Sequence, residues 1–205
     1  MSKKPLIIFE GIEGSGKTYH LNKVAKYLKK KNLSFIKIRE PGGNKNSEKI
    51  RNLILNSKAS FNRKTDLLLY QAARSENIAN IKNNYKKKII LIDRFTDSTI
   101  AYQHFGFGLN LKIIKNLNKY LLGNIKPSFT FLNIVDKKNM LIRLKLRKKL
   151  NRYDKFDASF YNKVQNGFRK LARNKKNYKI INSNLDIIEN ENKILSILNR
   201  LIKWI

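Results

Sequence analysis

Residues 6–18 decide the fold, and they read Leu-Ile-Ile-Phe-Glu-Gly-Ile-Glu-Gly-Ser-Gly-Lys-Thr. The apolar run Leu6–Phe9 predicts a buried strand, and residues 11–18 match the pattern G-x-x-x-x-G-K-[ST] directly after it. In such a loop the glycines bring backbone N–H groups close to phosphate oxygens, and the following helix adds its positive end. The stretch therefore predicts a phosphate-binding loop between a strand and a helix, with a nucleoside triphosphate as its ligand.

The loop residues have separate expected roles. Lys17 is expected to reach the β- and γ-phosphates, and Thr18 to offer its hydroxyl to Mg²⁺. The whole ATP-binding segment is Gly11, Ile12, Glu13, Gly14, Ser15, Gly16, Lys17 and Thr18. The motif by itself does not indicate which molecule accepts the phosphoryl group.

Apolar and amphipathic stretches alternate on the C-terminal side of the loop. Continuous apolar runs are typical of strands buried on both faces of a parallel sheet. They predict further strands at 35–38, 89–92, 129–135 and 179–181. Helices are predicted at about 16–31, 46–56, 63–84, 97–104, 110–122, 137–149, 157–174 and 190–204. This order predicts an α/β fold of the P-loop NTPase type, with three layers: a five-stranded parallel sheet and helices on both faces. Because no linker or repeat interrupts the pattern, we expect residues 1–205 to form a single domain.

Polar side chains follow the second and third predicted strands. The carboxyl ends of parallel strands meet at one edge of the sheet, so Arg39, Asp93 and Arg94 are expected near the loop. Arg39 and Arg94 would meet phosphate there, and the Asp93 carboxylate suits Mg²⁺ or its water shell. The alternatives are a solvated Arg39 in an ordinary turn and an Asp93 that only caps its strand. We also expect the Glu40–Pro41 bond to be cis, because a tight turn beside a ligand favours it.

The segment 143–154 is rich in cations. Arg143 and Arg147 are spaced to share one face of a helix. A mobile arginine segment of this kind can close over a triphosphate and neutralise the charge that develops on it. The alternative is a solvated charged face.

Composition excludes several classes of protein. The 205 residues contain no cysteine, which rules out disulfides and thiolate chemistry, and the two histidines disfavour a zinc site. No apolar run is long enough for a membrane span, and no signal-peptide pattern opens the chain, so we expect a cytoplasmic protein. Lys and Arg total 45 against 14 Asp and Glu, a net charge of +31. A nucleic-acid or acidic-membrane partner would explain this charge. So would compositional drift toward Lys, Asn and Ile, which the even spread of the cations favours.

Taken together, these motifs resemble bacterial thymidylate kinases over nearly the whole chain. The matching strings are FEGIEGSGKT at 9–18, REPGG at 39–43, YQAAR at 70–74, DR at 93–94 and STIAYQ at 98–103. The resemblance implies transfer of the γ-phosphoryl group of ATP to dTMP, giving dTDP for dTTP synthesis, with Mg²⁺ and in a homodimer. Another nucleoside or nucleotide kinase remains an alternative, although Arg39 and Arg94 favour an acceptor that already carries phosphate. A P-loop protein that binds nucleic acid and uses ATP as a switch is the alternative from a different class.

The resemblance also implies a dTMP-binding set: Glu13, Arg39, Pro41, Tyr70, Arg74, Arg94, Ser98, Tyr102 and Gln103. Within it, Glu13 would hold the deoxyribose 3′-hydroxyl, while Arg39 and Arg94 would grip the phosphate. Tyr70 would stack on thymine, and Arg74 would donate to its carbonyl oxygen. Ser98 and Gln103 would line the base and sugar pocket, and Tyr102 would fill the space that a ribose 2′-hydroxyl needs.

The family has two styles, with a catalytic arginine either in the P-loop or in a lid. This P-loop has no arginine, so the chain resembles the lid-arginine style, with a mobile lid at about 143–156. Arg147 is the first candidate and Arg143 the second, and with Lys17, Asp93 and Arg94 they make up the expected catalytic set. The chain departs from the family pattern in three places: His104–Gly108 lacks a loop arginine, Asn151 and Asp154 replace an aspartate and a glutamate, and Asn182-Ser183 lacks a carboxylate.

Overall fold

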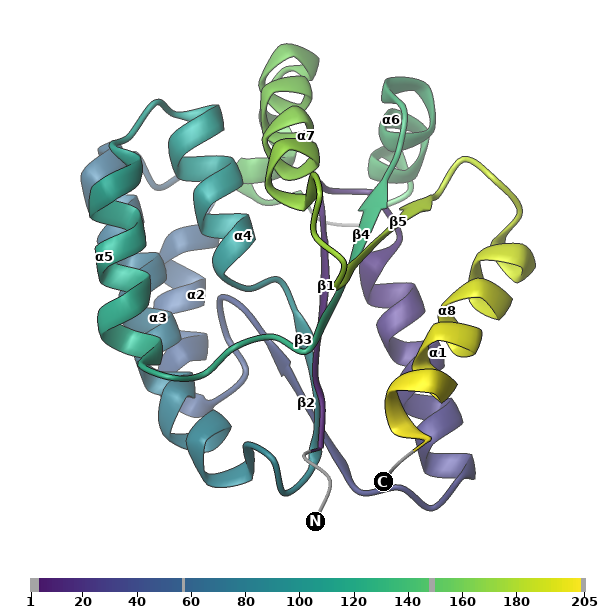
Figure 1. Ribbon diagram of the computed structural model, residues 1–205. Coiled ribbons are helices and arrows are strands. Elements are labelled where there is room, and N and C mark those ends of the chain that lie inside the picture. Colours follow the sequence, from purple (N-terminus) through teal and green to yellow (C-terminus); the bar gives the residue numbers. More distant parts are fainter. Residues whose placement is uncertain (1–3, 57, 148–149, 204–205) are drawn as a thin grey trace.

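A computed structural model describes residues 4–56, 58–147 and 150–203 (Figure 1). Five parallel strands form one sheet in the order β2-β3-β1-β4-β5, with helices on both faces, so the expected fold is confirmed. The strands are β1 (Leu6–Gly11), β2 (Phe35–Arg39), β3 (Ile89–Asp93), β4 (Phe129–Ile134) and β5 (Tyr178–Asn182). β1 lies at the centre of the sheet, so the loop that follows it opens at the middle of the carboxyl edge.

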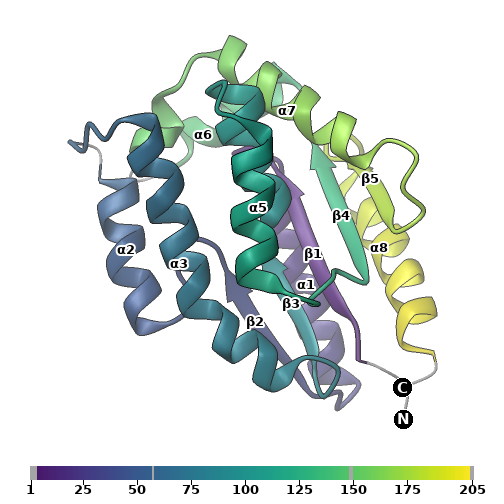
Figure 2. The same ribbon diagram turned by 60° about the vertical axis from the view of Figure 1, so that its left-hand side comes forward.

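The helices form two layers around the sheet (Figures 1 and 2). On one face lie α1 (Lys17–Lys30) and α8 (Ile187–Ile202), and on the other lie α2 (Lys45–Leu55), α3 (Arg63–Asn84) and α5 (Leu111–Leu122). Alternate residues of β1 serve the two faces, because successive side chains of a strand point in opposite directions. Ile7 and Phe9 pack with the α1 and α8 side, and Leu6 and Ile8 with the α3 and α5 side.

The helix expected at 97–104 differs in form. It consists of α4 (Thr96–Thr99), continued by a wide π-helical segment η1 (Ile100–Gly106). Four consecutive side chains at 100–103 are buried, a pattern that a regular amphipathic helix does not give. Helix α7 (Ala158–Ala172) presses closely on this segment: a Cβ added to Gly167 would lie 2.5 Å from the Phe105 ring.

The helix expected at 137–149 is shorter, since α6 (Lys137–Lys145) ends before Arg147. The expectation that Arg143 and Arg147 share one helical face is therefore wrong. Leu146 is 80% exposed, so burial does not favour another helical turn here. Residues 148 and 149, which belong to the expected helix and lid, lie outside the described residues.

Two further expectations concern the backbone. The last helix begins at Ile187 and not at 190, because the Asp186 side chain accepts hydrogen bonds from Ile188 N and Glu189 N and caps it there. Residue 204, its expected end, lies outside the described residues. The Glu40–Pro41 bond is cis, as expected. Among the residues described, no helix combines the length and the apolar character that crossing a membrane requires.

Candidate active site

The phosphate-binding loop takes its shape from backbone that only glycine allows. Gly11 has φ +143°, and a Cβ there would lie 2.3 Å from Asn133 O on β4. Gly16 is left-handed, with φ +81°, and caps α1 without any side-chain hydrogen bond. The first N–H groups of α1 therefore have no capping side chain, which makes the helix start a site for an anion such as phosphate.

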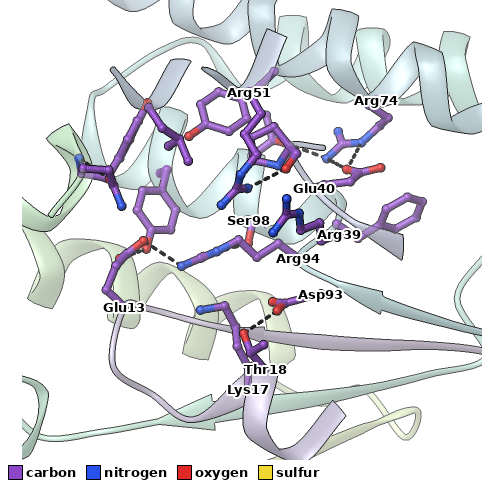
Figure 3. A pocket seen from close by; sticks show the side chains of 18 of the residues that line it. Glu13, Lys17, Thr18, Arg39, Glu40, Arg51, Arg74, Asp93, Arg94 and Ser98 are labelled. Carbon is purple, nitrogen blue, oxygen red and sulfur yellow. Dashed lines mark hydrogen bonds and ion pairs between the residues drawn. The ribbon is translucent and has the colours of Figure 1, made fainter. Parts of the chain in front are cut away.

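Lys17, Thr18 and Asp93 lie together beside this loop (Figure 3). Lys17 is 7% exposed, and its Nζ donates to Ile12 O at 3.2 Å. Burial, with Arg94 nearby, lowers the pKa of Lys17 to about 8. The Thr18 hydroxyl donates to Asp93 Oδ2 at 2.5 Å, although 75 residues separate them in the chain. The third strand thus delivers its terminal carboxylate to the loop, as the sequence predicts.

The Thr18–Asp93 pair fits Mg²⁺. A hydroxyl and a carboxylate are hard oxygen ligands, and Mg²⁺ is usually held by one or two carboxylates together with substrate phosphates and water. The described residues contain no group of three or more His, Cys, Asp or Glu side chains arranged for a metal. The donor set therefore suits a cation that arrives with a nucleotide.

Arg94 is fixed at the centre of the pocket. Its backbone is left-handed, with φ +67°, and its guanidinium donates to Gly11 O at 2.9 Å and to Glu13 Oε1 at 2.8 Å. The guanidinium carbon also lies 5.2 Å from the centre of the Tyr102 ring, and the Tyr102 hydroxyl donates to Glu13. Burial alone would raise the pKa of Glu13, but Arg94, Lys17 and the Tyr102 hydrogen bond lower it below its ordinary value. The Glu13 carboxylate therefore orients both the Arg94 guanidinium and the Tyr102 hydroxyl.

A group of arginines faces this centre. Figure 3 shows Arg39, Arg51 and Arg94 converging above Lys17. Arg39 makes a bidentate pair with Glu48, at 3.0 and 2.9 Å, and its side chain is 55% exposed. Arg51 donates to Pro41 O at 2.6 Å, so the Pro41 turn and α2 hold each other. Three cations around one hollow suit a second phosphate.

The far end of the pocket holds polar and aromatic side chains from α3 and η1. Arg74 is buried and pairs with Glu40, and its other nitrogens donate to Asn118 and Thr99. Each guanidinium nitrogen already has a partner, so a ligand that accepts a hydrogen bond from Arg74 would share one of these donors. Gln103 is 1% exposed, and its side-chain nitrogen and oxygen have no partner at regular hydrogen-bond geometry within the described part of the chain, although the Tyr153 hydroxyl interacts with the side chain. An unpaired buried amide is costly unless a ligand satisfies it.

The lid segment contributes Arg147, Asn151 and Tyr153 to the pocket lining. Arg147 pairs with the fully buried carboxylate of Asp154 at the 3₁₀ turn η2 (Arg152–Lys155), and that carboxylate also accepts from Asn151 N at 3.0 Å. The Tyr153 ring lies edge-on to Tyr70 and Tyr102, with centroids 5.9 and 6.0 Å away. Asn151 and Asp154, which depart from the pattern of the resemblance, are therefore hydrogen-bonded to each other and to Arg147 in the segment where the lid is expected.

The pocket brings together most of the residues that the sequence predicted. The predicted residues that line it are Glu13, Lys17, Thr18, Arg39, Pro41, Tyr70, Arg74, Asp93, Arg94, Ser98, Tyr102, Gln103 and Arg147. Gly11, Ile12, Gly14, Ser15 and Gly16 shape the loop without lining the pocket that the described residues form. Arg143 does not line it either: its guanidinium donates to Gly14 O at 2.9 Å and to Ser183 O at 2.6 Å, clamping the loop to the end of β5.

Sequence reasoning missed several lining residues: Glu40, Arg51, Leu55, Phe95, Thr99, Asn151 and Tyr153. Arg51 had a usable signal, because it lies four residues before Leu55 on the helix that follows the Arg39 turn. Tyr153 lies inside the basic segment 143–154, whose role was predicted from its cations alone and not from its aromatic ring.

Comparisons with known proteins address the whole of this site. A family model described as thymidylate kinase matches residues 9–194, which include every residue of the pocket. Thymidylate kinase from Thermosipho africanus is 37% identical over 183 residues, 88% of this chain and 90% of the relative. The chain belongs to the thymidylate kinase family. A further thymidylate kinase, from Finegoldia magna, is 34% identical over 95% of this chain and 97% of the relative. The crystal structure of thymidylate kinase from Ehrlichia chaffeensis has a TM-score of 0.77 and 30% identity, covering 96% of this chain and 99% of that one.

Proposed function

We propose that this protein transfers the γ-phosphoryl group of ATP to dTMP, giving dTDP for dTTP synthesis. A single observation carries the proposal: one pocket is lined by Lys17, by a cluster of arginines and by the buried amide of Gln103. These three kinds of lining suit a triphosphate, a second phosphate and a base. Family membership supports the same reaction. We also propose that the protein is cytoplasmic, as its sequence leads us to expect.

On the donor side, we assign ATP to the loop at 11–18. Lys17 and the first N–H groups of α1 would hold its phosphates, and Thr18 with Asp93 would hold Mg²⁺. When bound, Mg²⁺ supplies positive charge to the phosphate oxygens. Arg143 would keep the loop in place, because it bridges Gly14 O and Ser183 O.

On the acceptor side, we assign the dTMP phosphate to Arg39 and Arg94. Glu13 would hold the 3′-hydroxyl, next to Tyr102, whose position beside Glu13 suits exclusion of a ribose 2′-hydroxyl. Tyr70 would stack on the base, and Gln103 offers an unused donor and an unused acceptor to a thymine edge. The residues thus divide into a phosphate half and a base half.

The reaction then needs alignment and charge neutralisation more than covalent help. Arg94 would lie between donor and acceptor, and Arg147 would add a second cation from the lid. We take residues 1–205 as one domain with a mobile lid at about 143–156, whose closure would exclude water.

A panel of acceptors in one coupled assay tests the proposal. With ATP and Mg²⁺, we expect dTMP to be phosphorylated fastest, and thymidine, which lacks the phosphate, not to be phosphorylated. Faster turnover of thymidine would indicate a nucleoside kinase, and faster turnover of another monophosphate would indicate a different nucleotide kinase. ATP hydrolysis stimulated by DNA and not by dTMP would support the nucleic-acid switch.

We propose that the enzyme is a homodimer that pairs through its α2, α3 and α5 layer. Apolar side chains are exposed on all three helices: Leu53 at 53%, Leu68 at 59%, Ile113 at 55% and Tyr120 at 84%. The helices lie side by side on the outer face (Figure 2). Exposed apolar side chains on three neighbouring helices support an interface when they share one face, because a contiguous apolar patch marks a site of protein–protein contact.

Leu68→Asp is expected to weaken this dimer. Burying one leucine contributes about 1.5–3 kcal/mol, and a symmetric dimer loses two, so the dimer dissociation constant should rise roughly 10²- to 10⁴-fold. Sedimentation velocity over a concentration series measures it. Leu141→Asp on α6, away from this layer, is the matched control. A monomeric parent protein, or equal loss in both variants, would contradict the proposed interface.

The high net charge predicts only weak binding of nucleic acid. The cations are spread along the chain, and its lysine-rich segments 26–35 and 78–88, which contain no Asp or Glu, include the C-terminal ends of α1 and α3. Lysine is favoured near helix C-termini, so this distribution has a structural explanation. We expect affinity for duplex DNA that is independent of sequence and falls steeply between 50 and 200 mM salt, typically by about 10³ or more. Fluorescence anisotropy measures it, and tight sequence-selective binding at physiological salt would contradict drift as the cause.

A further inference from the structure

Glu10 is a buried carboxyl group with no role in the mechanism above. It is the residue of β1 just before Gly11, and it is 1% exposed. Its Oε1 accepts from Phe95 N at 2.8 Å and from Ser98 N at 3.2 Å, and its Oε2 accepts from the Ser98 hydroxyl at 2.5 Å. The Glu10 carboxylate, which belongs to β1, therefore caps the start of α4.

Helix α4 needs this outside cap. Phe95, at its N-cap position, has no polar side chain and makes no capping hydrogen bond. An N-terminal turn leaves its first N–H groups without intrahelical partners. Glu10 supplies the missing acceptor, and the residue it anchors directly follows Arg94, whose own backbone is left-handed.

Ser98 links the Glu10 carboxylate to the Arg94 side chain through two hydrogen bonds. A serine hydroxyl has one hydrogen to donate, and Ser98 donates it to Glu10. The lone pairs of Ser98 Oγ are then left for Arg94, whose Nη1 lies 3.3 Å away. Glu10 thus fixes the orientation of the Ser98 hydroxyl, and the hydroxyl oxygen in turn accepts a hydrogen bond from the Arg94 guanidinium.

Burying the Glu10 carboxylate costs free energy, because its charged form loses contact with water. Burial raises the pKa of Glu10 to about 7, and Asp97 adds to the effect, although the bonds from Ser98 and Phe95 oppose it. Asp97 itself is held by the Tyr178 hydroxyl at 2.6 Å. A side chain kept against such a cost is better explained by its contacts than by packing.

We propose that Glu10 is a positioning residue for phosphoryl transfer, which fixes Arg94 toward the acceptor phosphate through the Phe95 N–H and the Ser98 hydroxyl. Ser98 then serves the site through Arg94, in addition to lining the pocket. The inference rests on the proposed function, because it takes the Arg94 ligand to be the phosphate of dTMP.

Glu10→Gln tests the proposal with little change of volume. The glutamine carbonyl can still accept from backbone N–H groups, but its NH₂ cannot accept the Ser98 hydrogen. It donates to Ser98 Oγ instead and competes with Arg94. We expect dTMP binding, measured by titration calorimetry, to weaken about 10- to 100-fold, as for loss of a hydrogen bond to a charged group. Glu189→Gln, the same substitution at an exposed carboxylate on α8 that does not line the pocket, is the control and should leave dTMP affinity unchanged.

The decisive measurement repeats Glu10→Gln in an Arg94→Ala background. If Glu10 acts through Arg94, its substitution should there change dTMP affinity by less than about threefold, since coupled residues are not additive. An equal loss in both backgrounds, or a loss below about threefold in the parent, would overturn the proposal. Circular dichroism checks folding, and Ser98→Ala, which breaks the same link without touching the carboxyl group, should show the same dependence on Arg94. A parent protein that binds no dTMP would instead contradict the proposed function.

Discussion

Lys17→Ala is expected to lower turnover by roughly 10²- to 10³-fold or more while leaving the fold intact, because one preorganised charge contact in the transition state is worth about 3–4 kcal/mol. The Lys17 side chain is buried at the wall of the pocket, and the hydrogen bond that its truncation removes is the one from Nζ to the Ile12 carbonyl. Removing it leaves the loop, its glycines and the start of α1 in place. Steady-state kinetics with ATP and dTMP measures the effect.

Thermal melting and circular dichroism accompany this measurement. Lys23→Ala on the same helix is the matched control, because the Lys23 side chain is 41% exposed and its contacts, with Glu191 at 3.2 Å and with the Tyr19 ring, lie outside the pocket. It should melt and turn over like the parent. A Lys17→Ala variant with a native melting curve and turnover within about tenfold of the parent would contradict the assignment of the loop to ATP.

The sequence predicts the parts of the site that depend on short segments. β1, the glycine loop and α1 are contiguous, so one motif specifies their order and the place of Lys17 and Thr18. Asp93 and Arg94 could be placed as well, because parallel strands end at a common edge. The resemblance then supplied the residues of α3 and η1 that periodicity alone would have assigned to a half-buried helix face.

The features that the sequence did not predict depend on contacts between distant elements. Glu10 follows the predicted strand Leu6–Phe9 and received no role from the sequence, because its role becomes visible only when Ser98, 88 residues away, lies against it. The π-helical form of η1 depends on the close approach of α7 at Gly167. The end of α6 before Arg147 follows from the lack of burial at Leu146, which a helical pattern of cations does not reveal.

Arg147→Ala is expected to lower kcat far more than it raises the KM for dTMP. The P-loop contains no arginine, so the charge that develops between donor and acceptor lacks one cation unless the lid supplies it. Arg147 lines the pocket, and the buried carboxylate of Asp154 fixes its direction. A loss of roughly 10²- to 10³-fold in kcat is the size expected for a contact made mainly in the transition state.

Arg39→Ala provides the contrast, because the two arginines meet the reaction at different stages. Arg39 would hold the dTMP phosphate already in the ground state, so its loss should raise the KM for dTMP with a smaller change in kcat. An effect of Arg147→Ala on KM alone would mean that Arg147 only binds, and Arg143 or Arg152 would have to be tested in its place. The structure argues against both, since Arg143 is bound to the Gly14 and Ser183 carbonyls and Arg152 is paired with Asp66 on α3. Arg147 is also paired, with Asp154, but of the three arginines it alone lines the pocket that the described residues form.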